Sequence, residues 1–499
     1  MPVFSSLRPV LTMLLCGLLF VNAALRAEPQ VPIEQDEPQL PYLGDVSSSI
    51  ISTDEEHFLG QIWLMQLRSQ VTMLDDPVVN HYLENLLGQL AGSSQLQDRR
   101  LTLVVIDSPE LNAFAVPGGV VGVNAGLFSH ARNEAQLASV LAHELAHLSQ
   151  RHHVRMVDSA RKNSVPMLAA MLAGVVLAAS GGGDAGMAMI TGSQAALIQE
   201  QLRFSRQYES EADRIGMLNL VAAGYDPRQM PAMFEQMLQA RSFAGDRAPQ
   251  FLLTHPLTEA RIADTQNRVA QYPDNAEAKV DSIEYEQARS RMQNALEGNP
   301  VRIIKQVEAT LATQPGGALD DGNRYLLALA QLKAQRPQEA EATLKPLLER
   351  EPLALSYLYT QVQIDMARGR AQAALARLDP ALKRAPDSYP LTIAQAEALL
   401  ASGRPAAAEP LLARLSRERP WDAPVWYRLA EARGRSGDAR GMHRAQGEYA
   451  LLMGQIDDAQ RQLEYARALS QGNYGESASV DERLGQIRRL RKQLGMATR

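Results

Sequence analysis

The sequence predicts an α+β domain in the first half of the chain and an all-α solenoid in the second half. The first half alternates amphipathic segments of helical period with short apolar segments rich in β-branched residues. The second half is dominated by Ala and Leu and repeats with a fixed period. At 499 residues, the chain is long enough for two or more domains, each with its own core.

The first 27 residues have the composition of a secretory signal peptide. Arg8 supplies a positive start, an apolar run follows over residues 10–24, and Ala23 and Ala27 offer small residues for cleavage. The alternatives are an uncleaved anchor and a lipoprotein that uses Cys16. Bulky Leu15 before Cys16 argues against lipid attachment, so we expect cleavage and export.

Composition restricts the chemistry that the exported chain can use. Cys16 is the only cysteine, so the processed protein would need no disulfide and would have to build any metal site from His and carboxylates. The net charge of −6 gives no support for nucleic-acid binding. Residues 28–50 are rich in Pro and acidic residues and predict an extended arm.

The elements of the α+β part follow from caps and periodicity. Thr53 and Glu56 resemble a capping box that opens a helix to about Met73, and Asp76 before Pro77 opens a second helix. Three strands and a third helix are then expected, over residues 101–106, 112–115, 119–124 and 133–152. We expect the third strand to lie at the edge of the sheet.

An apolar region at residues 165–198 is interrupted by three consecutive glycines. Its first run has about 15 residues, fewer than the roughly 20 that cross a bilayer. We interpret it as a buried helix and a flexible loop, with membrane contact or an active-site lid as alternatives.

A repeat of 34 residues organises the second half. This is the period of the tetratricopeptide helix–turn–helix unit, in which Gly marks the turn, Ala allows close packing and Pro ends the second helix. We expect such units over residues 319–454, with degenerate units at 282–314 and after 455, forming a concave surface that binds protein segments. The repeated positions are Ala340, Ala374 and Ala408; Leu344, Leu378 and Leu412; Pro352, Pro386 and Pro420; and Gly369, Gly403 and Gly437.

Two histidines at helical spacing predict a metal site. His143 and His147 lie four residues apart, so both imidazoles fall on one face of the helix and can share an ion. Glu144 lies beside them, where it can reach a metal-bound water. We interpret His152 and His153 as part of a solvated helix end with no role in the site.

A catalytic zinc needs three protein ligands and one open position. We assign the third ligand to Glu209, in a helical stretch about 60 residues later, and we expect Glu211 to point elsewhere. Asp213 shares the face of Glu209 and is expected to orient a ligand histidine. The alternative for this stretch is an exposed, charged helix face.

These motifs resemble a known family. The chain resembles the metallopeptidases related to the CAAX prenyl protease and the membrane heat-shock metallopeptidase. The motifs that carry the resemblance are the strand–turn–strand at residues 112–119, the two histidines with Glu144, and Glu209 with Asp213. With the signal peptide and repeats, the chain is most similar to the periplasmic β-barrel assembly-enhancing protease family. The resemblance implies a zincin-like peptidase domain at 51–275 and a repeat domain at 280–499.

The resemblance also implies a regulatory residue and a cellular role. His255 matches a histidine implicated as an inhibitory fourth zinc ligand, and Arg261 is expected either to stabilise an oxyanion or to form a salt bridge. The expected activity is zinc-dependent cleavage of peptide bonds, with one zinc ion per chain and Glu144 as the base. Expected partners are misassembled outer-membrane proteins and the β-barrel assembly machinery in the periplasm, with peripheral membrane contact; a chaperone with a latent protease is the alternative.

Overall fold

The computed structural model describes residues 51–159, 195–243, 249–313, 318–470, 472 and 474–494. The expected signal peptide, the extended arm, and the apolar region 165–198 except its last four residues lie outside these ranges. The described residues belong to one compact unit that begins at Ile50. None of the helices among them is both long and apolar enough to cross a membrane.

The first helix, α2 (Thr53–Arg68), begins one residue earlier than predicted. The Ser52 hydroxyl accepts the Glu55 N–H, and the Glu55 carboxylate accepts the Ser52 N–H, so the capping box uses these two residues. This register buries Ile51 in one cluster with Trp63. The predicted box at Thr53 is therefore wrong by one residue, and the helix ends at Arg68 rather than near Met73.

The second helix, α3 (Pro77–Gly92), begins as predicted. The Asp76 carboxylate accepts the N–H groups of Val78 and Val79 at 3.0 and 3.1 Å, and Pro77 occupies the first turn, where a missing N–H costs nothing.

A three-stranded sheet follows, with β1 (Thr102–Ile106), β2 (Ala113–Val116) and β3 (Val120–Asn124). Its order is β1-β3-β2, with β1 parallel and β2 antiparallel to β3. The three predicted strands are confirmed, but the prediction that the third lies at the edge is wrong. Gly118 and Gly119, both at positive φ, turn β2 tightly back onto one side of β3, and β1 pairs with the other side.

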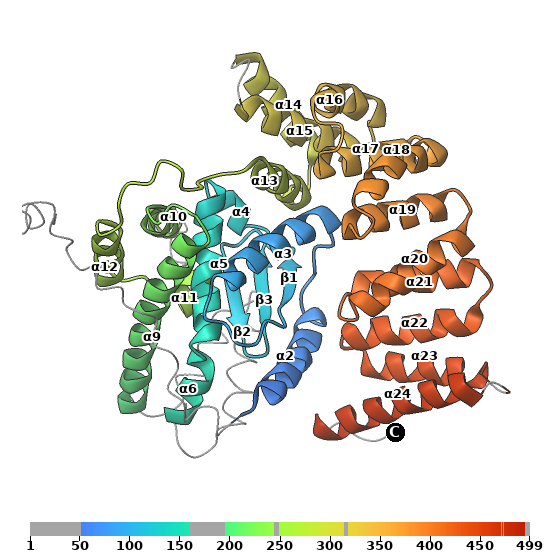
Figure 1. Ribbon diagram of the computed structural model, residues 1–499, viewed down its shortest axis with the longest axis horizontal. Helices are drawn as coiled ribbons and strands as arrows, with labels where there is room; N and C mark the ends of the chain where they lie inside the picture. Colours follow the sequence, from blue (N-terminus) through green and yellow to red (C-terminus); the bar gives the residue numbers. More distant parts are fainter. Residues whose placement is uncertain are drawn as a thin grey trace, which may run out of the picture. The chain divides into compact units, whose positions relative to one another are not determined.

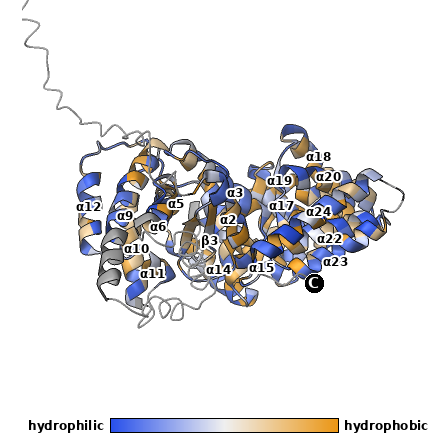
Figure 2. Cartoon of the chain, turned by 90° about the horizontal axis from the view of Figure 1, so that it is seen from below, coloured by the Kyte–Doolittle hydropathy of each residue, from blue (hydrophilic) through white to orange (hydrophobic). Residues whose placement is uncertain are grey.

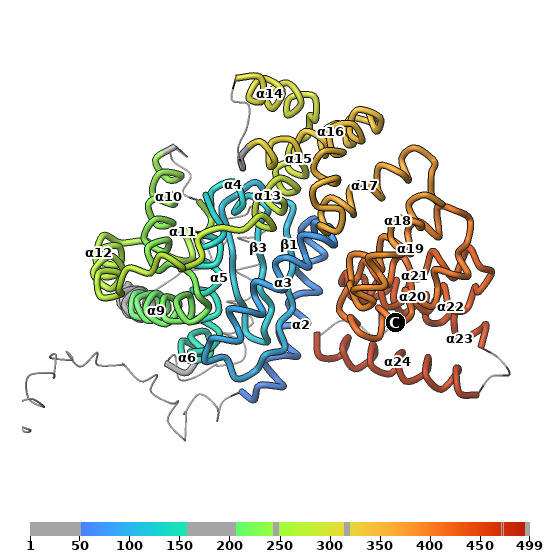
Figure 3. The backbone as a smooth tube through the Cα atoms, turned by 45° about the horizontal axis from the view of Figure 1, so that its top comes forward, coloured from blue at the N-terminus to red at the C-terminus, as the bar shows by residue number. Residues whose placement is uncertain are grey.

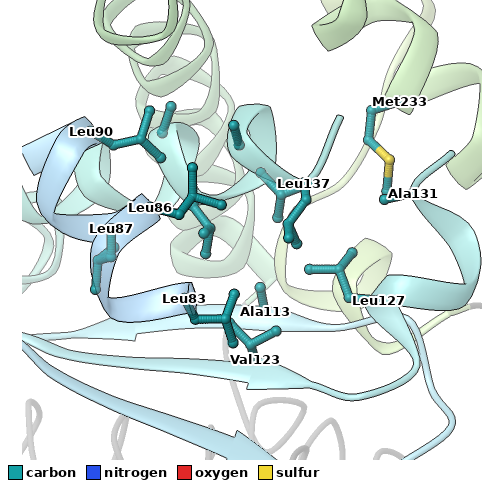
Figure 4. Packing of buried hydrophobic residues seen from close by; sticks show 14 of the residues in the cluster. Leu83, Leu86, Leu87, Leu90, Ala113, Val123, Leu127, Ala131, Leu137 and Met233 are labelled. Atoms are coloured by element: carbon teal, nitrogen blue, oxygen red, sulfur yellow. The ribbon is translucent and has the colours of Figure 1, made fainter. Parts of the chain in front are cut away.

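Helix α5 (Glu134–Ser149) lies between the sheet and helix α9 (Ala195–Ala222), as Figures 1 and 3 show. Figure 4 shows its core side, where Leu137 approaches side chains from α3, the sheet and α10, among them Leu83, Val123 and Met233. The remaining helices of this part are α4 (Leu127–His130), α6 (His152–Ser159), α10 (Gln229–Phe243), α11 (Gln250–Thr254) and α12 (Glu259–Val269).

Among its described residues, the second half consists of helices joined by short turns, which confirms the predicted solenoid. Gly369, Gly403 and Gly437 adopt φ of 71°, 72° and 83° in the turns between paired helices, where a side chain would be strained. Figure 2 shows hydrophobic and hydrophilic residues mixed along these helices, as amphipathic packing requires. They are α13 (Ile283–Leu296), α14 (Pro300–Thr313), α15 (Ala318–Lys333), α16 (Pro337–Arg350), α17 (Leu355–Ala367), α18 (Ala371–Arg384), α19 (Tyr389–Ala401), α20 (Pro405–Glu418), α21 (Ala423–Arg435), α22 (Ala439–Leu452), α23 (Ile456–Ala468) and α24 (Tyr474–Gln493).

Candidate metal centre

Helix α5 holds His143 and His147 in a buried position. The Asn133 side chain caps the helix by accepting the Gln136 N–H at 2.9 Å, and every residue from Glu134 to His147 is buried. Because the helix is enclosed on all sides, the two imidazoles cannot turn to solvent. Their Nε2 atoms lie 3.1 Å apart, so both rings direct the same nitrogen at one point.

Helix α9 brings two carboxylates to this point. Glu209 and Asp213 are 4% and 2% exposed. The Glu209 oxygens lie 3.4 Å from His143 Nε2 and 3.4 Å from His147 Nε2. Asp213 Oδ1 lies 3.0 Å from Nδ1 of His143, on the side of the ring opposite the nitrogen that faces Glu209.

The two helices approach closely because α9 carries glycine at their crossing. A Cβ atom on Gly216 would lie 3.1 Å from both Cα and N of His143. Any larger residue would therefore push α9, and Glu209 with it, away from the histidines of α5.

His255 joins the same cluster from the end of α11. Its Nδ1 lies 3.4 Å from His143 Nε2 and 3.1 Å from Glu209 Oε1. Within the described residues, His143, His147, Glu209 and His255 form a group whose ligand atoms all lie within 4.8 Å of one another. The four residues proposed from the sequence are thus brought together.

Glu144 lies beside this group and is not part of it. Its side chain is 1% exposed, and its Oε1 is 3.4 Å from His255 Nε2. Burial raises the pKa of the Glu144 carboxyl, while the nearby histidines and a backbone hydrogen bond from Ala115 oppose that rise. A raised pKa suits a group that must take up and then release a proton.

Arg261 forms the salt bridge that was one of the two expectations for it. Its Nε and Nη2 donate to the two oxygens of Asp213, both at 2.7 Å, and its Nη1 lies 3.0 Å from Glu209 Oε2. Although burial alone would raise it, the guanidinium and His143 lower the pKa of Asp213. Despite burial of the ring, the carboxylates of Asp213 and Glu209 raise the pKa of His143 to about 10.

The interpretation of His152 and His153 as a solvated helix end is wrong. Helix α5 stops at Ser149, and Arg151 takes a left-handed conformation, with φ of 50°, before α6 begins. His152 is 2% exposed, and its Nδ1 lies 3.0 Å from Nδ1 of His147. His153 Nε2 lies 3.1 Å from the Ala115 carbonyl of β2. No sequence pattern predicts this turn, because non-glycine residues such as arginine seldom adopt a left-handed conformation.

The fold and the site together define a metallopeptidase with a helical repeat domain. Residues 77–269 match Peptidase family M48, and residues 365–438 match a tetratricopeptide repeat.

Sequence similarity to named proteins shows which kind of metallopeptidase this is. The chain is 36% identical over 336 residues to a protein of Vibrio cholerae that is named as a β-barrel assembly-enhancing protease. The match covers 65% of this chain and 67% of that protein. It is 33% identical over 333 residues to the beta-barrel assembly-enhancing protease of Escherichia coli K12, covering 66% and 67%. The mitochondrial metalloendopeptidase OMA1 of Arabidopsis thaliana is 31% identical over 198 residues, covering 40% and 37%. The chain belongs to the family of β-barrel assembly-enhancing proteases.

Proposed function

We propose that the metal of this peptidase is zinc, held by His143, His147 and Glu209. The observation that carries the proposal is the spacing of the donor atoms. Two atoms that are each about 2.0–2.1 Å from a tetrahedral zinc ion lie about 3.4 Å apart. The donors of these three residues are 3.1, 3.4 and 3.4 Å apart, so they fit one such ion without rearrangement.

A zinc ion held by these residues would supply Lewis-acid activation of a water molecule and of the scissile carbonyl. Glu144 takes the proton from the attacking water and then delivers it to the departing amine. Asp213 orients His143 through its Nδ1 side, and Arg261 fixes Asp213 with two hydrogen bonds. The enclosed position of Glu144 keeps bulk water away from the proton that it carries.

Strand β2, rather than β3, is the strand against which an extended substrate would pair. It is an edge strand, and Ala115 at its middle contacts Glu144 through its N–H and His153 through its carbonyl. Pairing there would recognise main chain more than side chains, which favours unfolded clients.

We further propose that His255 restrains the enzyme. As a fourth ligand, it would occupy the position that a reacting water needs. Its Nδ1 distances of 3.4 and 3.1 Å to His143 and Glu209 fit that role.

The proposed setting is the bacterial cell envelope, with a cleaved signal peptide at 1–27, a peptidase domain at 51–275 and repeats at 280–499. The relatives named for β-barrel assembly support this setting. The clients would be misassembled outer-membrane proteins, and the repeats would bind clients or the assembly machinery.

Cleavage of casein by the purified chain tests the catalytic assignment. Glu144→Gln should abolish cleavage and keep one zinc per chain, whereas Glu209→Ala should lose the zinc. Glu235→Gln, the same change at an exposed position of α10, is the control and should cleave like the wild type. Equal cleavage by Glu144→Gln would remove Glu144 as the base.

The second candidate function is a chaperone or scaffold with a latent peptidase, which the fit of His255 as a fourth ligand favours. Complementation of a strain lacking the protein separates the two. Restoration of envelope integrity by Glu144→Gln would favour the chaperone, and failure to restore it would favour the protease.

A further inference from the structure

The two imidazoles of the metal centre use their ring nitrogens in the same way. Each directs Nε2 at the cluster and turns Nδ1 away from it. The Nδ1 of His143 faces Asp213, the partner that the sequence suggested. The Nδ1 of His147 faces the Nδ1 of His152 at 3.0 Å.

Two ring nitrogens at this distance need one proton between them. A neutral imidazole that binds a metal through Nε2 carries its proton on Nδ1. His147 would therefore donate from Nδ1, and His152 would accept at Nδ1 and carry its own proton on Nε2. That Nε2 lies 3.2 Å from Glu211 Oε2, an acceptor, so each donor in the row meets an acceptor.

The surroundings hold His152 in this orientation. Its ring stacks on Tyr208 with centroids 4.6 Å apart and an interplanar angle of 22°. Glu211 is fixed from its other side by Arg155 Nη1 at 3.1 Å. Arg151, which is left-handed with φ of 50°, separates α5 from α6, and the ring of His152 lies 4.9 Å from that of His147, centroid to centroid.

His152 is not placed to bind the metal itself. It approaches His147 from the Nδ1 side, opposite the Nε2 that faces His143 and Glu209. It is also absent from the group of residues, among those described, whose ligand atoms can share one ion.

We propose that His152 is a positioning residue, which accepts a hydrogen bond from His147 at Nδ1 and donates another from Nε2 to Glu211. It keeps His147 in the tautomer and orientation that direct Nε2 at the metal. This role rests on the proposed function, since it needs His147 to be a ligand. Partners of ligand histidines typically change metal affinity about ten- to hundredfold when removed.

Zinc competition with a chromophoric chelator, on the purified full-length chain, tests the proposal. His152→Phe keeps the stacked ring but has no acceptor, whereas His152→Asn keeps an acceptor near the Nδ1 position. We expect His152→Phe to weaken zinc binding about ten- to hundredfold and His152→Asn to remain within about threefold of the wild type. The visible spectrum of the cobalt-substituted protein should change in His152→Phe and resemble the wild type in His152→Asn.

Further variants test whether Glu211 and His152 act on zinc binding through their hydrogen bonds or only through packing. Glu211→Leu should weaken zinc binding less than His152→Phe, and the double variant should be no weaker than His152→Phe, because Glu211 acts through His152. Wild-type affinity in His152→Phe, or equal losses in the Phe and Asn variants, would overturn the positioning role.

The same measurement distinguishes the two proposals. A wild-type chain that binds no zinc would end the proposed function and this inference together. Zinc bound through Glu209 but unaffected by His152→Phe would end only the inference.

Discussion

Replacing Gly216 by valine tests whether close contact between α5 and α9 holds the metal centre together. The Cβ atom alone would lie 3.1 Å from the Cα and N atoms of His143, whereas non-bonded carbons rest about 3.5–4.0 Å apart. The helices would therefore have to separate by about half an ångström, and the obstacle is backbone, which cannot rotate away. Overpacking of this kind costs about 1–3 kcal/mol, well above the few tenths that valine gains over glycine in a helix.

The matched control is Gly88→Val in α3. Gly88 is exposed, and a Cβ atom there would meet nothing within 4 Å. We expect Gly216→Val to lower the free energy of unfolding by about 2 kcal/mol, and Gly88→Val to leave it nearly unchanged. Denaturant unfolding followed by tryptophan fluorescence and circular dichroism measures both.

Zinc affinity provides a second measurement for the same pair. Separation of the helices would lengthen the distances from Glu209 to His143 and His147, now 3.4 Å, so Gly216→Val should bind zinc several-fold more weakly. Equal stability and equal affinity in the two variants would refute the reasoning, because they would mean that α9 can move freely against α5.

Three further predictions concern charges and the metal. Arg261→Met leaves the buried carboxylate of Asp213 without its guanidinium and should cost about 3–5 kcal/mol in denaturant unfolding, whereas Arg268→Met, which breaks a partly exposed pair on the same helix, should cost about 0.5 kcal/mol or less. His255→Ala should cleave casein faster than the wild type while it keeps its zinc; slower cleavage would show that His255 does not restrain the site. A chelator should abolish cleavage, and zinc at about 100 times its Kd should restore activity and add about 2.7 kcal/mol of stability; activity that survives complete metal removal would contradict the metal mechanism.

The sequence alone predicted the elements that depend on local patterns. Asp76 before Pro77 marked a helix start, because both residues act within one turn. The 34-residue spacing predicted the helix pairs, because each repeat packs mainly on its neighbours and positive-φ glycines close the turns. The spacing of His143 and His147 placed both on one helix face for the same local reason.

No local pattern predicts which residues join these histidines. Glu209 and His255 were chosen because a catalytic ion needs more than two ligands and because the motifs resembled a family. Their approach to His143 depends on packing between helices far apart in the chain, of which the contact at Gly216 is one part.

Only the tertiary structure decided three features. The edge position of β2 follows from pairing of β1 with the free side of β3, which no local pattern encodes. Arg261 bonds Asp213 rather than facing a substrate, since α12 packs beside α9. His152 contacts His147 after α5 ends at Ser149 and Arg151 adopts a conformation that few non-glycine residues adopt, whereas helical periodicity predicted an unbroken helix over residues 133–152.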